Sequence, residues 1–334
     1  MPILVNPEFQ GDLEAQHVVN ILVGPAGGVR KTLRGFYCPP AKNYTGGEED
    51  ETSMGRSTKD GLVLVFPNYA GLKTWDREVG AWVSRLGYHA LVCDYYTAEE
   101  FPYADREAIE FPPGSPERKR HFERGMRVMN DCLLTKAASF LRPMVNTWLR
   151  EGIARVLSSR ESSSRAGSET SVVVSTLGYC LGGVAGLELW RSGAQELDAV
   201  VSVHGVLQTK PLDPQATAEV LVTQPPGHPE APKPGVKILL EHGESDHLVP
   251  EAMVRNFLGK ECKAHQAAVT LHAHPDTPHG FALPLGVGNA AFPDADRQSC
   301  RSILEFWRTE VFREVETGGA MALRVAKTPA GVPI

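Results

Sequence analysis

Short runs of β-branched and aliphatic residues alternate with longer amphipathic stretches over most of the chain, and this pattern predicts strands and helices in turn. The later apolar runs have no polar face, which is typical of strands buried on both sides of a parallel sheet. We expect strands at 17–23, 30–37, 62–66, 89–93, 172–176, 199–203, 236–240 and 268–272. We expect helices at 74–86, 121–151, 182–192, 250–260 and 295–313. The alternation predicts a doubly wound sheet with right-handed crossovers, built as one domain over residues 1–334.

Three polar segments interrupt this alternation. Residues 43–61 and 158–171 are rich in glycine, serine and charged residues, which predicts surface loops. Residues 208–235 are rich in proline and glycine and too polar for a core. We expect this third segment to be an active-site rim or a lid.

Composition narrows the class of protein further. With 42% hydrophobic residues the chain can bury a sizeable core, and a net charge of −6 argues against a nucleic-acid partner. The basic cluster at 116–127 is expected to be a solvated helix start. Six cysteines without a Cys-x-x-Cys pair suit reduced thiols. The first 16 residues lack the basic start and long apolar core of a signal peptide, so we expect a cytoplasmic protein.

The most apolar stretch, VVVSTLGYCLGGVAGLELW at 172–190, has three competing interpretations. It is about long enough to span a membrane, but it contains Glu188, begins with a strand-like valine run, and carries adjacent glycines at 182 and 183. We therefore expect no membrane partner. The two remaining interpretations of Cys180 are a buried structural thiol and a nucleophile on a sharp turn.

The five residues from Gly178 to Gly182 read Gly-Tyr-Cys-Leu-Gly and fall where the predicted strand gives way to a helix. This is the setting of the nucleophile elbow, whose usual form is Gly-x-Ser-x-Gly. Glycines are needed because the nucleophile has a strained backbone and its neighbours crowd the adjoining strand and helix. The helix N-terminus favours a thiolate and later an oxyanion. The pattern predicts that Cys180 is a nucleophile.

A cysteine nucleophile needs a base, and the base needs an orienting partner. Asp246 follows the strand VKILL, and His279 follows the strand AVTLH, so both lie where parallel strands end. The order Cys180, Asp246, His279 is that of an α/β-hydrolase triad. The alternative role for Asp246 is a helix cap near Pro250, and the two roles are not exclusive. The competing acids are Glu241, Glu244 and Asp276.

Histidines are numerous near the end of the chain, and a metal site is the alternative to a triad. The candidates are His242, His247, His272, His274 and His279. Their spacings fit no zinc motif that we can defend. We expect neither a metal nor an organic cofactor.

The segments GYCLGG, HGESDHLVP and PHGF resemble those of the dienelactone hydrolases, and PNYAGLKTWDREVGAWVSRLGYHALVCDYY at 67–96 resembles that family's first strand–helix–strand unit. The resemblance implies an α/β-hydrolase fold, a mostly parallel central sheet flanked by helices on both faces. It also implies hydrolysis of a small-molecule ester or lactone through an acyl-thioester on Cys180. The oxyanion would then be held by the backbone N–H groups of Leu181 and Tyr69.

Two departures from the family concern the substrate. Where the family has a glutamate that interacts with the resting cysteine, this chain has Asn68. The family's two carboxylate-binding arginines have no counterpart in DYYTAEE at 94–100 or HGFAL at 279–283. We therefore expect a neutral substrate. The expected substrate contacts are Asn68, Tyr95, Tyr96, His204 and Phe281. Arg106, Arg191 or another residue of 97–125 remains an alternative source of positive charge.

Three functions remain open from the sequence. Ester or lactone hydrolysis is the first. The second keeps the same nucleophile for acyl transfer, C–C cleavage or cyclisation of a biosynthetic intermediate. The third is a non-catalytic relative that only binds a ligand, and retention of all three triad residue types argues against it.

Overall fold

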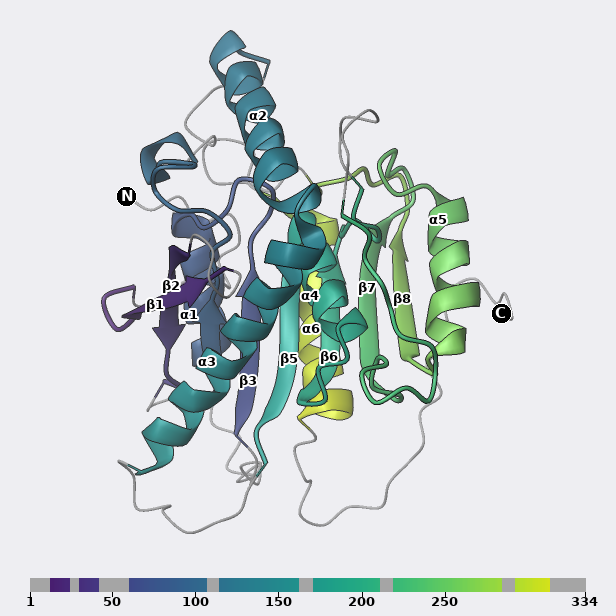
Figure 1. Cartoon of the computed structure of the whole chain (residues 1–334). Helices are drawn as coiled ribbons and strands as arrows, with labels where there is room; N and C mark the ends of the chain where they lie inside the picture. Colours follow the sequence, from purple (N-terminus) through teal and green to yellow (C-terminus); the bar gives the residue numbers. More distant parts are fainter. Residues whose placement is uncertain are drawn as a thin grey trace, which may run out of the picture.

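In the computed structural model, the described residues are 13–24, 30–41, 60–106, 114–161, 171–210, 219–283 and 292–312. Their strands form one eight-stranded sheet in the order β1–β2–β4–β3–β5–β6–β7–β8 (Figure 1). The strands are β1 His17–Val23, β2 Lys31–Cys38, β3 Gly61–Phe66, β4 His89–Val92, β5 Val173–Tyr179, β6 Leu197–Val203, β7 Lys237–Gly243 and β8 Ala268–His274. The pairs β1–β2 and β2–β4 are antiparallel, and every other pair is parallel. All eight expected strands are confirmed.

Helices cover both faces of the sheet, as expected (Figure 1). They are α1 Thr74–Arg85, α2 Pro116–Met129, α3 Arg142–Glu161, α4 Leu181–Arg191, α5 Glu251–Asn256 and α6 Pro293–Phe306. A 3₁₀ turn spans Tyr103–Asp105, and π-helical turns span Asn130–Leu134, Ala137–Leu141, Phe257–Cys262 and Trp307–Val311. In Figure 1, α3 and α4 lie in front of the sheet and α1 and α6 behind it, and each pair closes its own hydrophobic core.

The single helix expected at 121–151 is wrong in two respects. The helix α2 begins earlier, at Pro116, because the Ser115 hydroxyl caps it by accepting from the Arg118 N–H at 3.2 Å. The helical path is then broken at Lys136, which has φ −117° and ψ 33°. A proline at 143 could not sit inside one continuous helix without losing a hydrogen bond. In the structure it lies in the first turn of α3.

Most of the two Gly/Ser-rich loops expected at 43–61 and 158–171 lies outside the described residues. So do residues 211–218 of the proline-rich segment, whose role as a lid stays a prediction. The described part of that segment is bound to the π-helical turn Ala137–Leu141, which precedes α3. The Glu219 carboxylate accepts from the Ser139 N–H at 2.6 Å and from the Ser139 hydroxyl at 2.5 Å.

Two further expectations concern the state of the cysteines and the absence of a membrane-spanning segment. All six cysteines are free, as the scattered spacing predicted. Within the described ranges, no helix combines the length and apolar character needed to cross a membrane. The apolar stretch at 172–190 is divided between the strand β5 and the helix α4, which begins at Leu181.

Candidate active site

The turn between β5 and α4 carries Cys180 in a conformation that few side chains adopt, with φ 54° and ψ −110°. The neighbouring strand fixes it, because the Cys180 N–H donates to the Val203 carbonyl at 3.1 Å and its carbonyl accepts from the Val206 N–H at 3.2 Å. A Cβ at position 178 would overlap the backbone of Gly182, and one at position 182 would overlap the Phe66 carbonyl. The glycines of the motif are therefore required by close backbone approach, which confirms the strand–turn–helix expected for the elbow.

Three side chains far apart in sequence form one hydrogen-bonded chain at the carboxyl edge of the sheet. His279 Nε2 lies 3.2 Å from Cys180 Sγ, and His279 Nδ1 lies 2.8 Å from Asp246 Oδ2. The second carboxylate oxygen, Oδ1, accepts from the N–H groups of Leu248 at 2.8 Å and Val249 at 3.0 Å. Asp246 thus fixes the turn before α5 and orients the imidazole with the same side chain, but it does not cap that helix, whose N-cap is Pro250. The structure brings together all three residues that the sequence put forward as a triad.

Electrostatic interactions among Cys180, His279 and Asp246 shift the pKa values of the histidine and the aspartate. Burial opposes protonation of His279, but the Cys180 thiolate and the Asp246 carboxylate raise the pKa of the imidazole to about 10. Burial alone would raise the pKa of Asp246, yet its hydrogen bonds to His279 and to two backbone N–H groups hold that pKa below its usual value. The arrangement therefore favours an imidazolium at His279.

The other cysteines that show a shift differ from Cys180 in their surroundings. Burial raises the pKa of Cys38 and of Cys262 to about 12 and that of Cys132 to about 11. Each therefore stays a thiol at neutral pH and is a poor nucleophile. Cys180, by contrast, lies within hydrogen-bonding distance of His279.

A second element of the site is the loop after β3. The backbone N–H of Tyr69 makes no hydrogen bond to another described residue, and the same holds for Leu181 at the start of α4. The first N–H groups of a helix have no partner within it. Both N–H groups are thus available for an oxyanion next to Cys180, as the resemblance implied.

Tyr95 and Tyr96 do not line the cavity, and the expectation that they contact the substrate is corrected. Both rings are fully buried behind the loop after β3. The Tyr95 hydroxyl donates to the Pro67 carbonyl at 2.9 Å, and the Tyr96 hydroxyl donates to the Tyr69 carbonyl at 2.9 Å. Their phenols are committed to holding the backbone that carries the Tyr69 N–H.

His204 and Phe281 are also displaced from the expected role. His204 is fully buried, does not line the cavity, and lies edge-to-face behind His279, with 5.3 Å between ring centroids. Burial and the charge of His279 hold the pKa of His204 well below its usual range, so its ring is neutral. Phe281 packs edge-to-face against His204, with 5.2 Å between ring centroids. Both residues support the His279 ring from behind.

Glu241, one of the competing acids, binds two of the histidines that were candidates for a metal site. Glu241 binds His272 Nδ1 at 2.9 Å and His274 Nε2 at 2.7 Å, and it also accepts from Ser302. The residues described contain no group of side chains that could hold a metal ion. Neither Glu244 nor Asp276 makes a hydrogen bond to the His279 ring, whose described acid partner is Asp246.

Above Cys180 lies a cavity of about 930 Å³. Asn68, Tyr69, Leu181 and His279 line it beside the cysteine. Most of the remaining wall is apolar and comes from Trp75, Phe122, Met126, Met129, Leu134, Val184, Val206, Leu248, Met253, Leu283 and Phe292. One face of α2 supplies part of this wall.

Comparison with known proteins agrees with these features. A sequence model of the dienelactone hydrolase family matches residues 52–310, well over half of the chain. The chain belongs to the dienelactone hydrolase family. It is an ester-cleaving hydrolase with the α/β-hydrolase fold of that family. No curated protein sequence matches the chain significantly.

Solved structures share the fold at low sequence identity. One named m3DLH is 20% identical with a TM-score of 0.53, covering 89% of this chain and 99% of its own. A dienelactone hydrolase-like promiscuous phosphotriesterase from metagenomic libraries is 18% identical, with a TM-score of 0.50 and coverage of 89% and 99%. Esterase 2 of Thermogutta terrifontis, phosphorylated by paraoxon, is 15% identical, with a TM-score of 0.51 and coverage of 90% and 96%.

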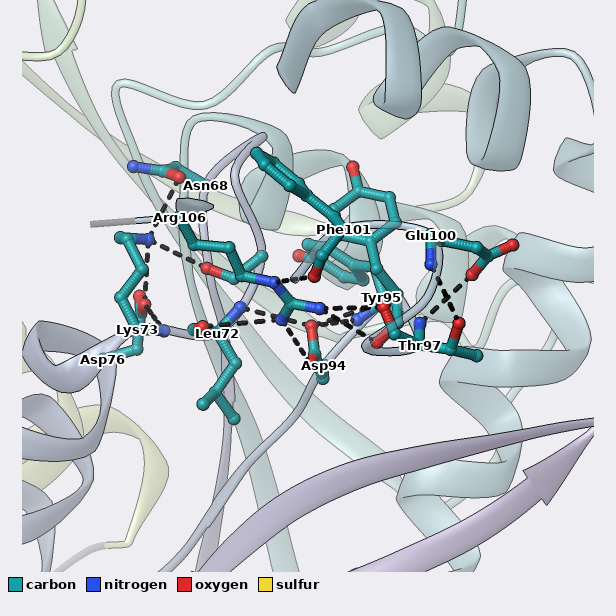
Figure 2. Close-up of polar contacts among 12 residues, drawn as sticks. Asn68, Leu72, Lys73, Asp76, Asp94, Tyr95, Thr97, Glu100, Phe101 and Arg106 are labelled. Carbon is teal, nitrogen blue, oxygen red and sulfur yellow. Dashed lines mark hydrogen bonds and ion pairs between the residues drawn. The ribbon is translucent and has the colours of Figure 1, made fainter. Parts of the chain in front are cut away.

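This dienelactone hydrolase differs from the family pattern in which cationic side chains line the cavity. Arg106 lines the cavity, but its guanidinium is fully buried and binds Asp94 Oδ2 at 2.5 Å and four backbone carbonyls (Figure 2). Arg191 is bonded to Glu188 and Glu261 at the far end of α4. Neither arginine has a free edge for a substrate carboxylate.

Positive charge nevertheless reaches the cavity, and part of it comes from residues 97–125, the alternative source that the sequence left open. Lys73 and Arg106 line its inner part, and three more cations, Arg118, Lys119 and Lys210, line its outer part. Lys119 is 77% exposed, at the first turn of α2. Arg118 and the buried Met129 lie near opposite ends of the cavity-lining face of α2, separated by about 16 Å of helix. No Asp or Glu lines the cavity among the described residues.

Proposed function

We propose that this hydrolase cleaves a small-molecule ester or lactone through an acyl-thioester on Cys180. The single observation that carries the proposal is the unbroken chain from Cys180 through His279 to Asp246, which opens onto the cavity. A thiolate, a base and an orienting acid within hydrogen-bond reach form the constellation for nucleophilic acyl transfer.

In the proposed acylation, Cys180 Sγ attacks the carbonyl carbon and the carbonyl electron pair moves onto oxygen. The backbone N–H groups of Leu181 and Tyr69 hold this oxyanion. The intermediate then collapses, the C–O bond breaks, and the leaving alkoxide takes the proton from His279. In deacylation, His279 removes a proton from water, the resulting hydroxide attacks the thioester, and the acid is released with Cys180 regenerated.

The test is incubation with a panel of small esters and lactones in which water is the only acceptor. Release of the free acid, at a rate proportional to enzyme, is the expected result. Consumption of substrate only when a second alcohol, amine or thiol is present, with the acyl group found on that acceptor, would instead favour acyl transfer. No turnover of any ester or lactone would favour a ligand-binding role.

The pKa of His279 predicts the alkaline limb of the pH profile. Because that pKa is raised to about 10, the imidazolium persists through neutral pH and is lost as the pH rises through 10. An alkyl ester needs this proton for its leaving group, whereas p-nitrophenolate leaves without it. We expect kcat/KM for an alkyl ester to fall above pH 10 and that for a p-nitrophenyl ester to change less. A common fall near pH 7 would contradict this account.

We also propose that the part of the substrate next to Cys180 is neutral and apolar. The two cations in that region are saturated: Lys73 Nζ has three acceptors and Arg106 has five. A carboxylate placed beside the reacting carbonyl would lose hydration without gaining a charged partner. An anionic group has matching charge only at the outer end, near Arg118, Lys119 and Lys210.

A matched pair of substrates tests this prediction. The pair is a dienelactone-type acid and its neutral methyl ester, and we expect kcat/KM to favour the methyl ester by about tenfold or more. Preference for the acid would overturn the proposal. Loss of that preference in Arg118→Gln but not in Arg120→Gln would then assign it to the outer cations, because Arg120 is on the same helix, bonded to Glu117, and does not line the cavity.

The free thiols support a proposal about the compartment in which the protein works. We propose that it works in the cytoplasm, because six free cysteines, four of them deeply buried in addition to Cys180, suit a reducing compartment.

A further inference from the structure

The loop that follows β3 is fixed by the side chain of Asn68. Its carbonyl oxygen Oδ1 accepts from the Ala70 N–H at 2.9 Å and from Lys73 Nζ at 3.2 Å. Its backbone carbonyl accepts from the Gly71 N–H at 3.0 Å, which closes a turn. Figure 2 shows the Lys73 side chain reaching from the start of α1 to the oxygen of Asn68, and no contact is drawn from the amide nitrogen of Asn68.

These contacts leave the carboxamide one orientation. A carboxamide has an acceptor at one end and two donors at the other, so the partners decide which end is which. Turning the group over would set its NH₂ against the Ala70 N–H and the Lys73 ammonium, three donors facing one another. Two hydrogen bonds, one of them charge-assisted, would be lost. Asn68 therefore presents Nδ2, a donor, on the side away from Lys73.

That donor has no partner among the described residues. Asn68 is 6% exposed and lines the cavity together with Cys180 and His279, yet Nδ2 makes no hydrogen bond within the described part of the chain, to Cys180 Sγ included. Lys73 cannot act in its place, because its three donors go to Asn68, the Gly71 carbonyl at 2.9 Å and Asp76 at 2.9 Å. A preorganised, nearly buried N–H donor beside a nucleophile is the arrangement that stabilises developing negative charge.

We propose that Asn68 Nδ2 is a third oxyanion donor, beside the backbone N–H groups of Tyr69 and Leu181. This inference rests on the proposed function. As the Sγ–C bond forms and the carbonyl electron pair moves onto oxygen, Nδ2–H donates to that oxygen and releases it when the C–O bond breaks. The family has a glutamate at this position, which offers acceptors. Here Lys73 and Ala70 hold an amide by its oxygen, which leaves its donor end for the oxyanion.

Two variants, one isosteric and one truncated, separate this role from a structural one. Asn68→Asp keeps the oxygen that binds Ala70 and Lys73 but replaces the donor by a negatively charged acceptor. Asn68→Ala removes both. If Asn68 only holds the loop, Asn68→Asp should resemble the wild type and Asn68→Ala should be the damaged variant. If Nδ2 binds the oxyanion, Asn68→Asp should be the slower of the two.

The experiment measures kcat and KM of both variants on a neutral ester, with thermal unfolding to confirm folding. We expect kcat of Asn68→Ala to fall by about 10²- to 10³-fold with KM little changed, and that of Asn68→Asp to fall further. Gln208→Glu places the same charge elsewhere in the cavity and should lower kcat less than Asn68→Asp. The reverse order of the two Asn68 variants, with the wild type active, would overturn this inference alone. A wild type inactive on every ester would overturn the proposed function instead.

Discussion

Replacing Cys180 by alanine should lower kcat for ester hydrolysis by about 10⁴-fold or more, because the thiolate is the group that bonds to the substrate carbon. The fold should survive. Alanine tolerates the φ of 54° no worse than cysteine, and the hydrogen bonds that fix the turn come from the backbone to Val203 and Val206. Initial rates on a neutral ester, with circular dichroism and thermal unfolding, measure both effects.

The matched control is Cys132→Ala. Cys132 is a half-buried thiol outside the cavity, and burial raises its pKa to about 11. We expect this variant to keep nearly wild-type kcat. A correctly folded Cys180→Ala protein with wild-type turnover would show that another group carries the reaction.

His279→Ala should be nearly as damaging as Cys180→Ala, since it removes both the proton acceptor for water and the cation that stabilises the thiolate. Asp246→Asn should cost roughly 50-fold less than either, because an orienting acid leaves more residual rate when it is lost than nucleophile or base does. The amide would still bind near Leu248 and Val249 but would no longer hold an imidazolium. Single-turnover acylation and steady-state kcat distinguish the two steps.

Asp276→Asn is the control for the acid. Asp276 lies three residues before His279 and has a left-handed φ of 52°, a conformation that asparagine also tolerates. Its substitution should leave kcat near the wild-type value. If Asp276→Asn or Glu244→Gln were crippling and Asp246→Asn were mild, the assignment of the acid to Asp246 would be wrong.

Much of the fold could be predicted from local pattern. The apolar runs located the central strands β3, β4 and β5 because these are buried on both faces. The edge strand β1 instead alternates exposed and buried residues. The region between residues 116 and 161 was harder. Its amphipathic pattern continues through Lys136, and only the Ser115–Pro116 cap and the proline at 143 signalled two helices in place of one.

The triad could be predicted because each of its members follows a strand of a parallel sheet, and such strands end at one edge. The supporting residues could not. The hydroxyls of Tyr95 and Tyr96 bind backbone carbonyls 27 and 28 residues away in sequence, and a phenol gives no sequence signal of which carbonyl it will reach. The direction of the Asn68 amide likewise depends on Lys73, whose contact is visible only in three dimensions.

The central claim is that a bond forms between Cys180 and the acyl group. The measurement that tests it most directly is mass spectrometry of the enzyme quenched in acid within milliseconds of mixing with a p-nitrophenyl ester, followed by peptide mapping. The account predicts a mass increase equal to one acyl group, located on Cys180 and absent from Cys180→Ala. Turnover of the ester with the acyl group on another residue, or with no adduct in either protein at any time point, would contradict it.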